Sequence, residues 1–151
     1  MKIQVKHSGG EAFAQKLRAK AERLRNLKPL WELVGMYVQK QTIKERFDKE
    51  QAPDGTKWTP LSPARVKQRL KRHKSGNMKI LQDTGELRRS IQYEAAQQYV
   101  RIGSNLVYSR IHQFGGRHIP VRPFLGITQQ ERQHINNMFR TYIKRHVFNG
   151  G

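Results

Sequence analysis

The stretch PLWELVGMYVQKQTIKERFDK, from Pro29 to Lys49, sets the helical scaffold of this chain. Its apolar side chains recur at steps of three and four residues, the spacing of one helix face. They are Leu30, Leu33, Val34, Tyr37 and Val38, continued by Ile43 and Phe47. Pro29 suits the first turn of a helix, where a backbone N–H has no partner in the helix. The stretch therefore predicts an amphipathic helix that ends at about residue 49.

Two further segments have the same apolar period. The first predicts a helix over about 11–26, which we expect to form a long N-terminal helical hairpin with the helix above; its stripe is Phe13, Leu17, Ala21, Leu24 and Leu27. The second predicts a C-terminal amphipathic helix over about 128–147, whose core face is Ile135, Met138, Phe139, Tyr142, Ile143 and Val147. Ile3 and Val5 alternate with polar residues and predict a strand over 2–6.

The middle of the chain combines short strands with turns. Residues 92–94 and 98–103 predict an antiparallel hairpin, with Val100 and Ile102 on one side. Asp83 and Glu86 have the spacing of a capping box, so we expect a short helix through residue 91. The pattern predicts helices together with an antiparallel hairpin, and the length of the chain is that of a single domain over 1–151.

Glycines and prolines shape the connecting segments. The Pro- and Gly-containing residues 52–60 predict a structured loop or a hinge. Asn105 is expected to cap a short helix that Gly115-Gly116 ends; its shared face is Val107, Ile111 and Phe114. Residues 119–125 are held extended by two prolines. Phe114, Phe124 and Leu125 are either ordinary core anchors or part of a subunit contact.

The charge of the chain points to an acidic or anionic partner. There are 30 Lys and Arg residues against 11 Asp and Glu residues, which gives a formal net charge of +19. Self-repulsion of this size favours burial against other chains or neutralisation by an anionic partner. That partner is nucleic acid, an acidic protein surface or an anionic membrane, and charge alone does not choose among them. No apolar stretch approaches the ~18 residues of a membrane span, so we expect no membrane partner. The first residues lack the apolar core of a secretory signal, and we expect synthesis in the cytoplasm.

The strongest local charge signal is a basic run within about 62–75, where a helix is expected because Ser62 and Pro63 suit its start. Val66 and Leu70 can rest on the protein while the cations face outward. The candidate anion-facing residues, expected to contact DNA or an acidic protein, are Arg65, Lys67, Arg69, Lys71, Arg72 and Lys74. The alternative is a solvated face or a mobile arm. We expect that replacing Arg69, Lys71 and Arg72 together by Gln preserves the fold.

Enzyme chemistry has little support in the sequence. The chain contains no cysteine, which excludes disulfides, thiolate catalysis and sulfur-ligated zinc or iron-sulfur sites. From Ala95 to Gly151 the only acidic residue is Glu131, so the carboxylates that hydrolytic metal sites need are missing there. We therefore expect no catalytic residues, no metal site and no cofactor.

Several motifs in order resemble the phage virion morphogenesis family, the tail-completion proteins of Mu-like phages and prophages. They extend over about 46–126 and are Arg46-Phe47, Pro53-Asp54-Gly55-Thr56-Lys57-Trp58 with Leu61, Ile80-Leu81, Thr84-Gly85-Glu86-Leu87-Arg88, Ser90-Ile91, Ile102-Gly103-Ser104, Tyr108, Ile111-His112-Gln113-Phe114-Gly115-Gly116 and Arg122-Pro123-Phe124-Leu125-Gly126. The basic run at 65–74 has no counterpart in the resemblance.

The resemblance implies a structural protein of the phage neck, in the virion at the head-tail junction. Proteins similar to these have an α+β fold, a small twisted antiparallel sheet flanked by helices, and we expect this fold class here. Such a protein completes the tail and helps join it to the DNA-filled head, and similar proteins form rings that are commonly sixfold. The implied partners are copies of the chain, head-connector and tail-tube proteins and double-stranded DNA in the channel. A closed ring joins two different surface patches of neighbouring subunits.

Two Pro-anchored segments are the expected ring contacts, the loop over 53–58 and the extended residues 119–125. The candidate interface or motif residues are Pro53, Asp54, Gly55, Trp58, His112, Gln113, Phe114, Gly115, Gly116, Arg122, Pro123, Phe124 and Leu125. The alternative function is a basic cytoplasmic nucleic-acid-binding module, for which the net charge and the basic run are the support. A hydrolase would need an acid-rich cluster that the sequence does not show.

Overall fold

The computed structural model describes residues 10–72 and 77–148, and the strand expected over 2–6 lies outside this part. The elements are α1 (Gly10–Arg25), α2 (Lys28–Gln41), η1 (Thr42–Asp48), α3 (Pro63–Arg72), α4 (Glu86–Arg89), β1 (Ile91–Ala95), β2 (Val100–Ser104), α5 (Ser109–Phe114), α6 (Gln129–Ile143) and η2 (Lys144–Phe148). The elements η1 and η2 are π-helical and continue α2 and α6. The predicted α+β class is confirmed.

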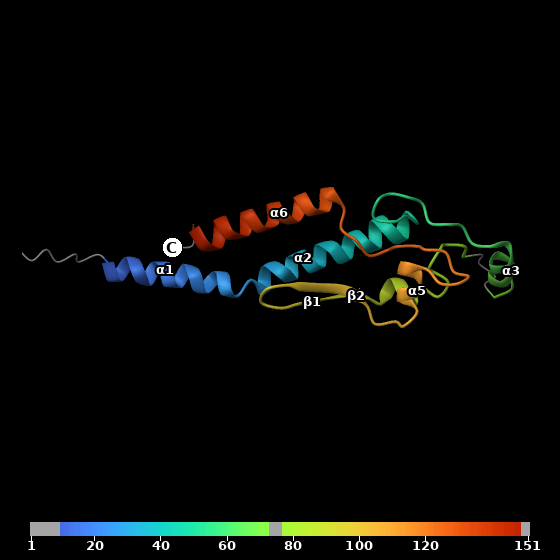
Figure 1. Ribbon diagram of the computed structural model, residues 1–151, viewed down its shortest axis with the longest axis horizontal. Coiled ribbons are helices and arrows are strands. Elements are labelled where there is room, and N and C mark those ends of the chain that lie inside the picture. Colours follow the sequence, from blue (N-terminus) through green and yellow to red (C-terminus); the bar gives the residue numbers. More distant parts are fainter. Residues whose placement is uncertain (1–9, 73–76, 149–151) are drawn as a thin grey trace, which may run out of the picture.

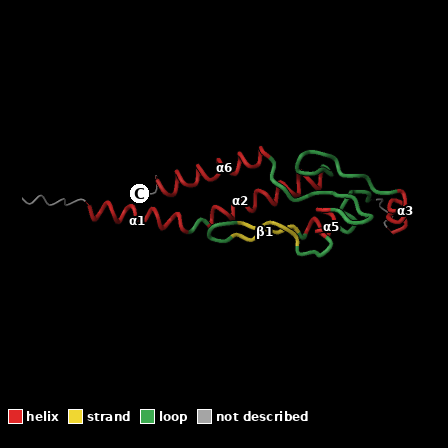
Figure 2. Tube along the Cα trace, viewed as in Figure 1, coloured by secondary structure: helices red, strands yellow, loops and turns green. Residues whose placement is uncertain are grey.

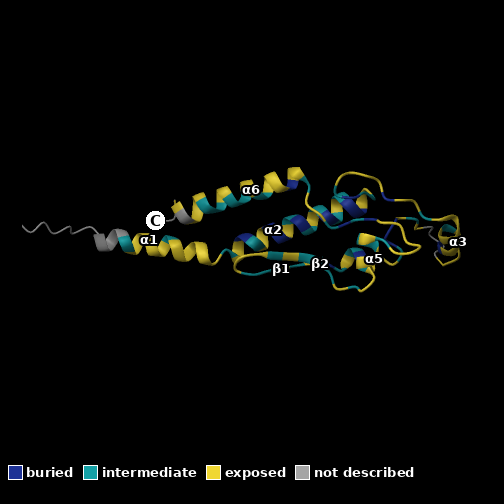
Figure 3. Cartoon of the chain, viewed as in Figure 1, coloured by how far each residue is buried: buried dark blue, intermediate teal, exposed yellow. Residues whose placement is uncertain are grey.

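The molecule is long and narrow, and α1 and α2 follow one another along its axis (Figure 1). They form one long helix with a bend at Asn26 and Leu27, which differs from the hairpin expected from the sequence. The helix that runs back beside α2 is α6 (Figure 1). Because Phe139 and Met138 of α6 pack against the α2 cluster, α1 has no apolar surface left to fold onto there. Leu17 and Leu24 of α1 are consequently exposed, as Figure 3 shows for most of this helix.

α2 lies between α6 on one side and the β1–β2 hairpin on the other (Figure 1). The strands pair antiparallel, with Tyr93 opposite Ile102 and Ala95 opposite Val100. Their side chains alternate, as the sequence predicts, and Val100 and Ile102 pack against α2. Gly35 permits this close approach, since a Cβ there would lie 2.4 Å from the Tyr93 ring. The helix can therefore rest directly on the sheet.

Two core clusters lie along the axis. The first surrounds Leu30, Val34 and Val38 of α2, and α6 covers it with half-buried side chains that include Phe139, whose ring lies 4.8 Å from that of Trp31. Among the described residues, no apolar side chain of α6 is fully buried. The face predicted to lie in the core therefore packs over the α2 cluster and stays partly exposed. The side chains of Phe13 and Val147 lie outside the described residues.

The second cluster lies at the end of the molecule where loops predominate (Figure 2). Its members come from η1, the loop after it, the segment that leads into α4, α4 itself, β1 and the extended residues. They are Phe47, Ala52, Trp58, Ile80, Leu81, Leu87, Ile91 and Phe124. The rings of Phe47 and Trp58 meet edge to face with centroids 5.6 Å apart. Packing among these aromatic rings thus holds together segments with little regular structure.

A buried ion pair joins η1 to the start of α6. Arg46 donates from Nη1 and Nη2 to the two carboxylate oxygens of Glu131 at 2.6 and 2.7 Å, and its Nη2 also donates to the Gly126 carbonyl at 3.2 Å. Both residues are almost fully buried. Two parallel charge-assisted bonds fix the relative position of the groups as well as their distance.

Glu131 also caps α6. The hydroxyl of Thr128 accepts from the Glu131 backbone N–H at 3.1 Å, and Glu131 Oε2 accepts from the Thr128 backbone N–H at 2.8 Å. This capping box was present in the sequence as Thr-Gln-Gln-Glu and was missed by the sequence analysis. Burial alone would raise the pKa of Glu131, but the bonds from Arg46 and Thr128 outweigh it and lower the pKa.

Glu131→Gln is expected to lower the unfolding free energy at neutral pH by about 3 to 5 kcal/mol, because Arg46 stays buried without a carboxylate. Since folding lowers the pKa of Glu131, the stabilisation is complete above the ordinary value of 4.5 and is lost as pH falls through the folded value. The variant should lose this part of the acid dependence. Denaturant unfolding at a series of pH values measures both effects.

Glu45→Gln is the matched control, because Glu45 pairs with Lys49 one helical turn away at the surface. It should cost at most about 0.5 kcal/mol. Equal losses of stability in the two variants would contradict a special role for the buried pair.

Candidate functional site

A cleft of about 1140 Å³ opens at the end of the molecule that carries α3 and α5. Its walls are α3 with the residues before it, the segment that leads into α4, α5, and the extended residues 119–125, which we call the arm. The cleft brings together part of the basic run and part of the family-like motifs, which the sequence analysis treated separately. Its charged and titratable lining residues are Arg65, Arg69, Asp83, Glu86, Tyr108, His112, His118 and Arg122.

The basic run forms α3, as predicted, but the side of the helix that packs against the rest of the protein is not the one expected. Arg69 is 4% exposed, whereas Leu70 is 57% exposed. Arg69 donates to the Lys79 carbonyl at 2.7 Å and lies 3.5 Å from Asp83, so polar partners, not apolar ones, decide which side faces inward. The prediction that Leu70 rests on the protein is wrong, and Arg69 is not an outward-facing cation. Val66 is half-buried.

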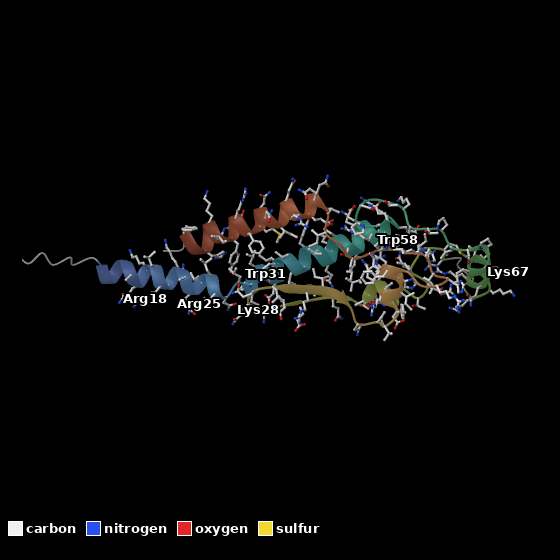
Figure 4. All side chains as sticks on the ribbon, viewed as in Figure 1. Arg18, Arg25, Lys28, Trp31, Trp58 and Lys67 are labelled. Carbon is white, nitrogen blue, oxygen red and sulfur yellow. The ribbon has the colours of Figure 1, made fainter. Side chains whose placement is uncertain are left out.

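The remaining described cations of the run are exposed. Lys67 extends from α3 at the far end of the molecule (Figure 4), and Arg65 and Lys71 are also exposed. Arg72 is exposed but pairs with Asp83 at 3.1 Å. Lys74 lies outside the described residues. The outward charge of α3 therefore comes mainly from Arg65, Lys67 and Lys71.

The Asp83 carboxylate pairs with arginines of α3 and does not cap α4. The N-cap of α4 is Gly85, at φ 73°, and no side chain bonds to it. The predicted capping box of Asp83 and Glu86 is thus wrong, because the Asp83 carboxylate pairs with Arg69 and Arg72. Glu86 accepts instead from the Tyr108 hydroxyl at 3.0 Å.

The helix α5 begins later than expected and leaves its apolar face open. Its N-cap is Tyr108, not Asn105. Val107 is 92% and Phe114 71% exposed, so Phe114 is no core anchor. Gly115 ends the helix at φ 85°, as the double glycine predicts, and directs the chain toward the arm. Phe114 therefore belongs to an exposed surface beside the cleft.

Side chains from the motifs bind the backbone of the arm. Gln113 accepts from the backbone N–H groups of Phe124 and Leu125 at 3.0 Å each and donates to the Leu125 carbonyl at 2.9 Å. Trp58 Nε1 donates to the Pro123 carbonyl at 2.8 Å. The arm has no strand partner along most of its length, so these bonds satisfy polar groups that would otherwise be unpaired.

The loop over 53–58 is a tight turn against the arm. Asp54 accepts from the Thr56 N–H at 2.9 Å, and Gly55 follows at φ 85°, as the Pro-Asp-Gly pattern predicts. Pro53 is half-buried beside Gly126, where a Cβ would lie 2.6 Å from the Pro53 ring. Trp58 and Phe124 are buried in the core of their own chain, which removes both from the expected subunit contacts.

Two arginines of the cleft, Arg122 and Arg65, bond to neutral groups and not to carboxylates. Arg122 is 7% exposed and donates to the carbonyls of Thr59 at 2.8 Å and Pro60 at 3.0 Å. Arg65 donates to the side-chain oxygen of Gln68 at 2.6 Å. Among the described residues, no carboxylate forms an ion pair with either arginine. Their partners are neutral oxygens.

His112 lines the same cleft as these arginines, and the charges of both act on it. Its Nδ1 is buried and has no hydrogen-bond partner in the structure. Burial lowers the pKa of His112, and the charges of Arg122 and Arg65 lower it further. Burial also lowers the pKa of Arg122, with a further effect from Arg69. Arg65, Arg69 and Arg122 raise the electrostatic potential in the cleft, which favours an anionic group there.

The described part of the chain gives no support to two other kinds of site. It contains no group of three or more His, Asp or Glu side chains that could hold a metal ion. None of its helices is long and apolar enough to cross a membrane. The cleft residues Gln68, Tyr108 and His118 were absent from the predicted binding set. Gln68 lies within the basic run, whereas only tertiary structure brings Tyr108 and His118 to the same cleft.

Arg69→Gln is expected to lower the unfolding free energy by about 1.5 to 3 kcal/mol, because a buried charged donor loses its partners. The triple replacement of Arg69, Lys71 and Arg72 should therefore weaken the fold, contrary to the sequence expectation. Lys67→Gln is the matched control on the same helix and should change stability by less than about 0.5 kcal/mol. Denaturant unfolding followed by circular dichroism measures both, and an unchanged midpoint for Arg69→Gln would contradict its buried role.

Comparison with known proteins agrees with the motifs. A G protein 1 of the Mu-like prophage FluMu in Haemophilus influenzae is 38% identical over 92 residues, and the match covers 60% of this chain and 62% of that relative, less than two thirds of its length. A putative capsid assembly protein G of Escherichia phage Mu is 31% identical over 111 residues, covering 68% of this chain and 70% of that protein. No solved structure matches the chain.

The profile of the phage virion morphogenesis family matches residues 8–144. This range includes α1, the basic helix α3, the arm and the whole of α6. The chain therefore belongs to the phage virion morphogenesis family, whose members act in assembly of the phage particle.

Proposed function

We propose that the chain is a structural protein of the neck of a tailed phage, which completes the tail and helps join it to the DNA-filled head as a ring, with six copies favoured. The observation that carries the proposal is the family match over residues 8–144. The name of the Mu relative, a putative capsid assembly protein, supports a role in assembling the particle. The proposed partners are further copies of the chain, head-connector proteins and tail-tube proteins.

Two separate apolar surfaces support a head-to-tail ring. One lies on α1, where Leu17 is 51% exposed, and the other on α5 and the arm. The second surface, which we call the α5–arm patch, consists of Ile111, Phe114, Ile119 and Val121. The two surfaces lie toward opposite ends of the long axis. Heterologous contacts that close a ring need two different patches of this kind.

The exposed cations of α3 suit an anionic surface inside such a ring. Lys67 and Lys71 extend from the helix without a carboxylate partner among the described residues. Phosphates of double-stranded DNA passing through the channel would offset the mutual repulsion of these charges, without reading the base sequence. This part of the proposal concerns the outer face of α3 and not the cleft.

Purified particles test the location directly. We expect the chain as a minor component, and antibody labelling should place it between head and tail. A labelled tail tip, or absence from particles together with turnover of a small substrate, would reject the neck proposal.

A double variant tests the ring contact. Phe114→Gln with Val121→Gln should reduce ring formation in native mass spectrometry, because exposed apolar area is removed from the α5–arm patch. The monomer should unfold within about 0.5 kcal/mol of the parent, since both side chains are exposed. Leu70→Gln is the control, because Leu70 is equally exposed on α3, outside the patch. Unchanged assembly in the double variant would exclude the patch as a contact.

A further inference from the structure

We propose that the cleft between α3 and the arm binds an extended segment of a partner protein in which acidic and apolar side chains alternate. The inference rests on the proposed function only in taking that partner to be another virion protein. The cleft, at about 1140 Å³, exceeds the roughly 300 to 1000 Å³ of most small-ligand pockets. Several residues of an extended chain can therefore enter it.

The charge on the cleft wall defines the polar half of the ligand. Arg65, His112 and Arg122 lie on the walls formed by α3, α5 and the arm. The arginines donate to neutral oxygens, and the buried His112 Nδ1 has no partner. A carboxylate near Arg65 and Arg122 would accept charge-assisted hydrogen bonds from their guanidinium groups and offset the repulsion between these two cations. The two arginines therefore favour an acidic side chain of the ligand in this part of the cleft.

The remaining lining defines the apolar half. The apolar residues that line the cleft, which we call its floor, are Leu61, Leu81, Leu87, Ile119 and Pro120. Leu81 and Leu87 belong to the core cluster, so this floor is rigid. An extended chain places successive side chains on opposite sides, and acidic residues can meet the arginines while apolar residues meet the floor.

DNA fits this cleft less well than a peptide. The phosphates of a duplex lie along a wide rod and cannot follow the bottom of a concave, partly apolar site. The outer lysines of α3, which do not line the cleft, are better placed for DNA.

A second copy of this chain also fits poorly. The chain has only 11 acidic residues. In the most acidic region, Glu45 pairs with Lys49, Asp48 pairs with Arg88, and Glu50 accepts from the Ile80 N–H. These carboxylates would have to leave their own partners to enter a neighbour's cleft. The cleft therefore favours a partner segment richer in acidic residues than this chain.

The test uses the full chain and an acetylated octapeptide that alternates Glu and Leu, at physiological ionic strength. We expect saturable binding by fluorescence anisotropy and a shift of the His112 ring signal in nuclear magnetic resonance spectra. Arg65→Gln should weaken binding about three- to tenfold, because one charge-assisted contact is lost. Gln68→Glu should weaken it at least as much, because it places a carboxylate beside Arg65.

Lys67→Gln is the matched control, because it changes the net charge by the same amount but alters a side chain outside the cleft. It should change the affinity by less than about twofold. Absence of binding, an equal loss in Lys67→Gln and Arg65→Gln, or displacement of the peptide by a short DNA duplex from all variants alike would overturn the proposal. Particle labelling is independent of these results: a neck location without peptide binding rejects the cleft inference alone.

Discussion

The buried pair of Arg46 and Glu131 is the contact on which the arrangement of this chain depends. Glu131 is the only acidic residue after Ala95, and it accepts from Arg46 while it caps α6. Arg46 precedes Phe47 of one core cluster, whereas α6 covers the other, so the pair ties the two clusters together. Buried pairs often add little net stability over apolar replacements, but they penalise alternative arrangements that leave a charge unpaired. In a chain with two small cores, this penalty fixes where α6 begins and where the arm ends.

The family-like motifs have mainly an architectural role in the described structure. Gln113, Trp58 and Arg122 bind the backbone of the arm and of the residues before α3, segments that lack a sheet to satisfy their polar groups. Such side-chain bonds require particular donors and acceptors at fixed positions, which explains why the motifs contain amide, indole and guanidinium groups. The bonds also set the width of the cleft, because the arm and the residues before α3 form two of its walls.

The spacing of apolar residues predicted the helices and the hairpin, because an element that buries one face repeats apolar residues at a fixed interval. It could not predict that α6, and not α1, covers α2, since both helices have apolar stripes of the same period and only their packing distinguishes them. The orientation of α3 was missed for a related reason. Hydropathy places Leu70 inward, but Asp83 and the Lys79 carbonyl draw Arg69 inward from positions that tertiary structure alone brings near. The capping box at Thr128 and Glu131 was visible in the sequence and would have located the start of α6.

Apolar side chains and cations that are exposed in the free chain link the stability of the fold to assembly. A lone helix of the length of α1 is marginally stable in water, and α1 contacts the body chiefly through η2. Its exposed leucines stand among cations, as do the apolar residues around the cleft. Binding of acidic, partly apolar surfaces at both ends would therefore stabilise the native state by mass action and relieve the repulsion of a +19 chain. For a neck protein that acts as proposed, this coupling would make the assembled particle, and not the free monomer, the most stable setting of the fold.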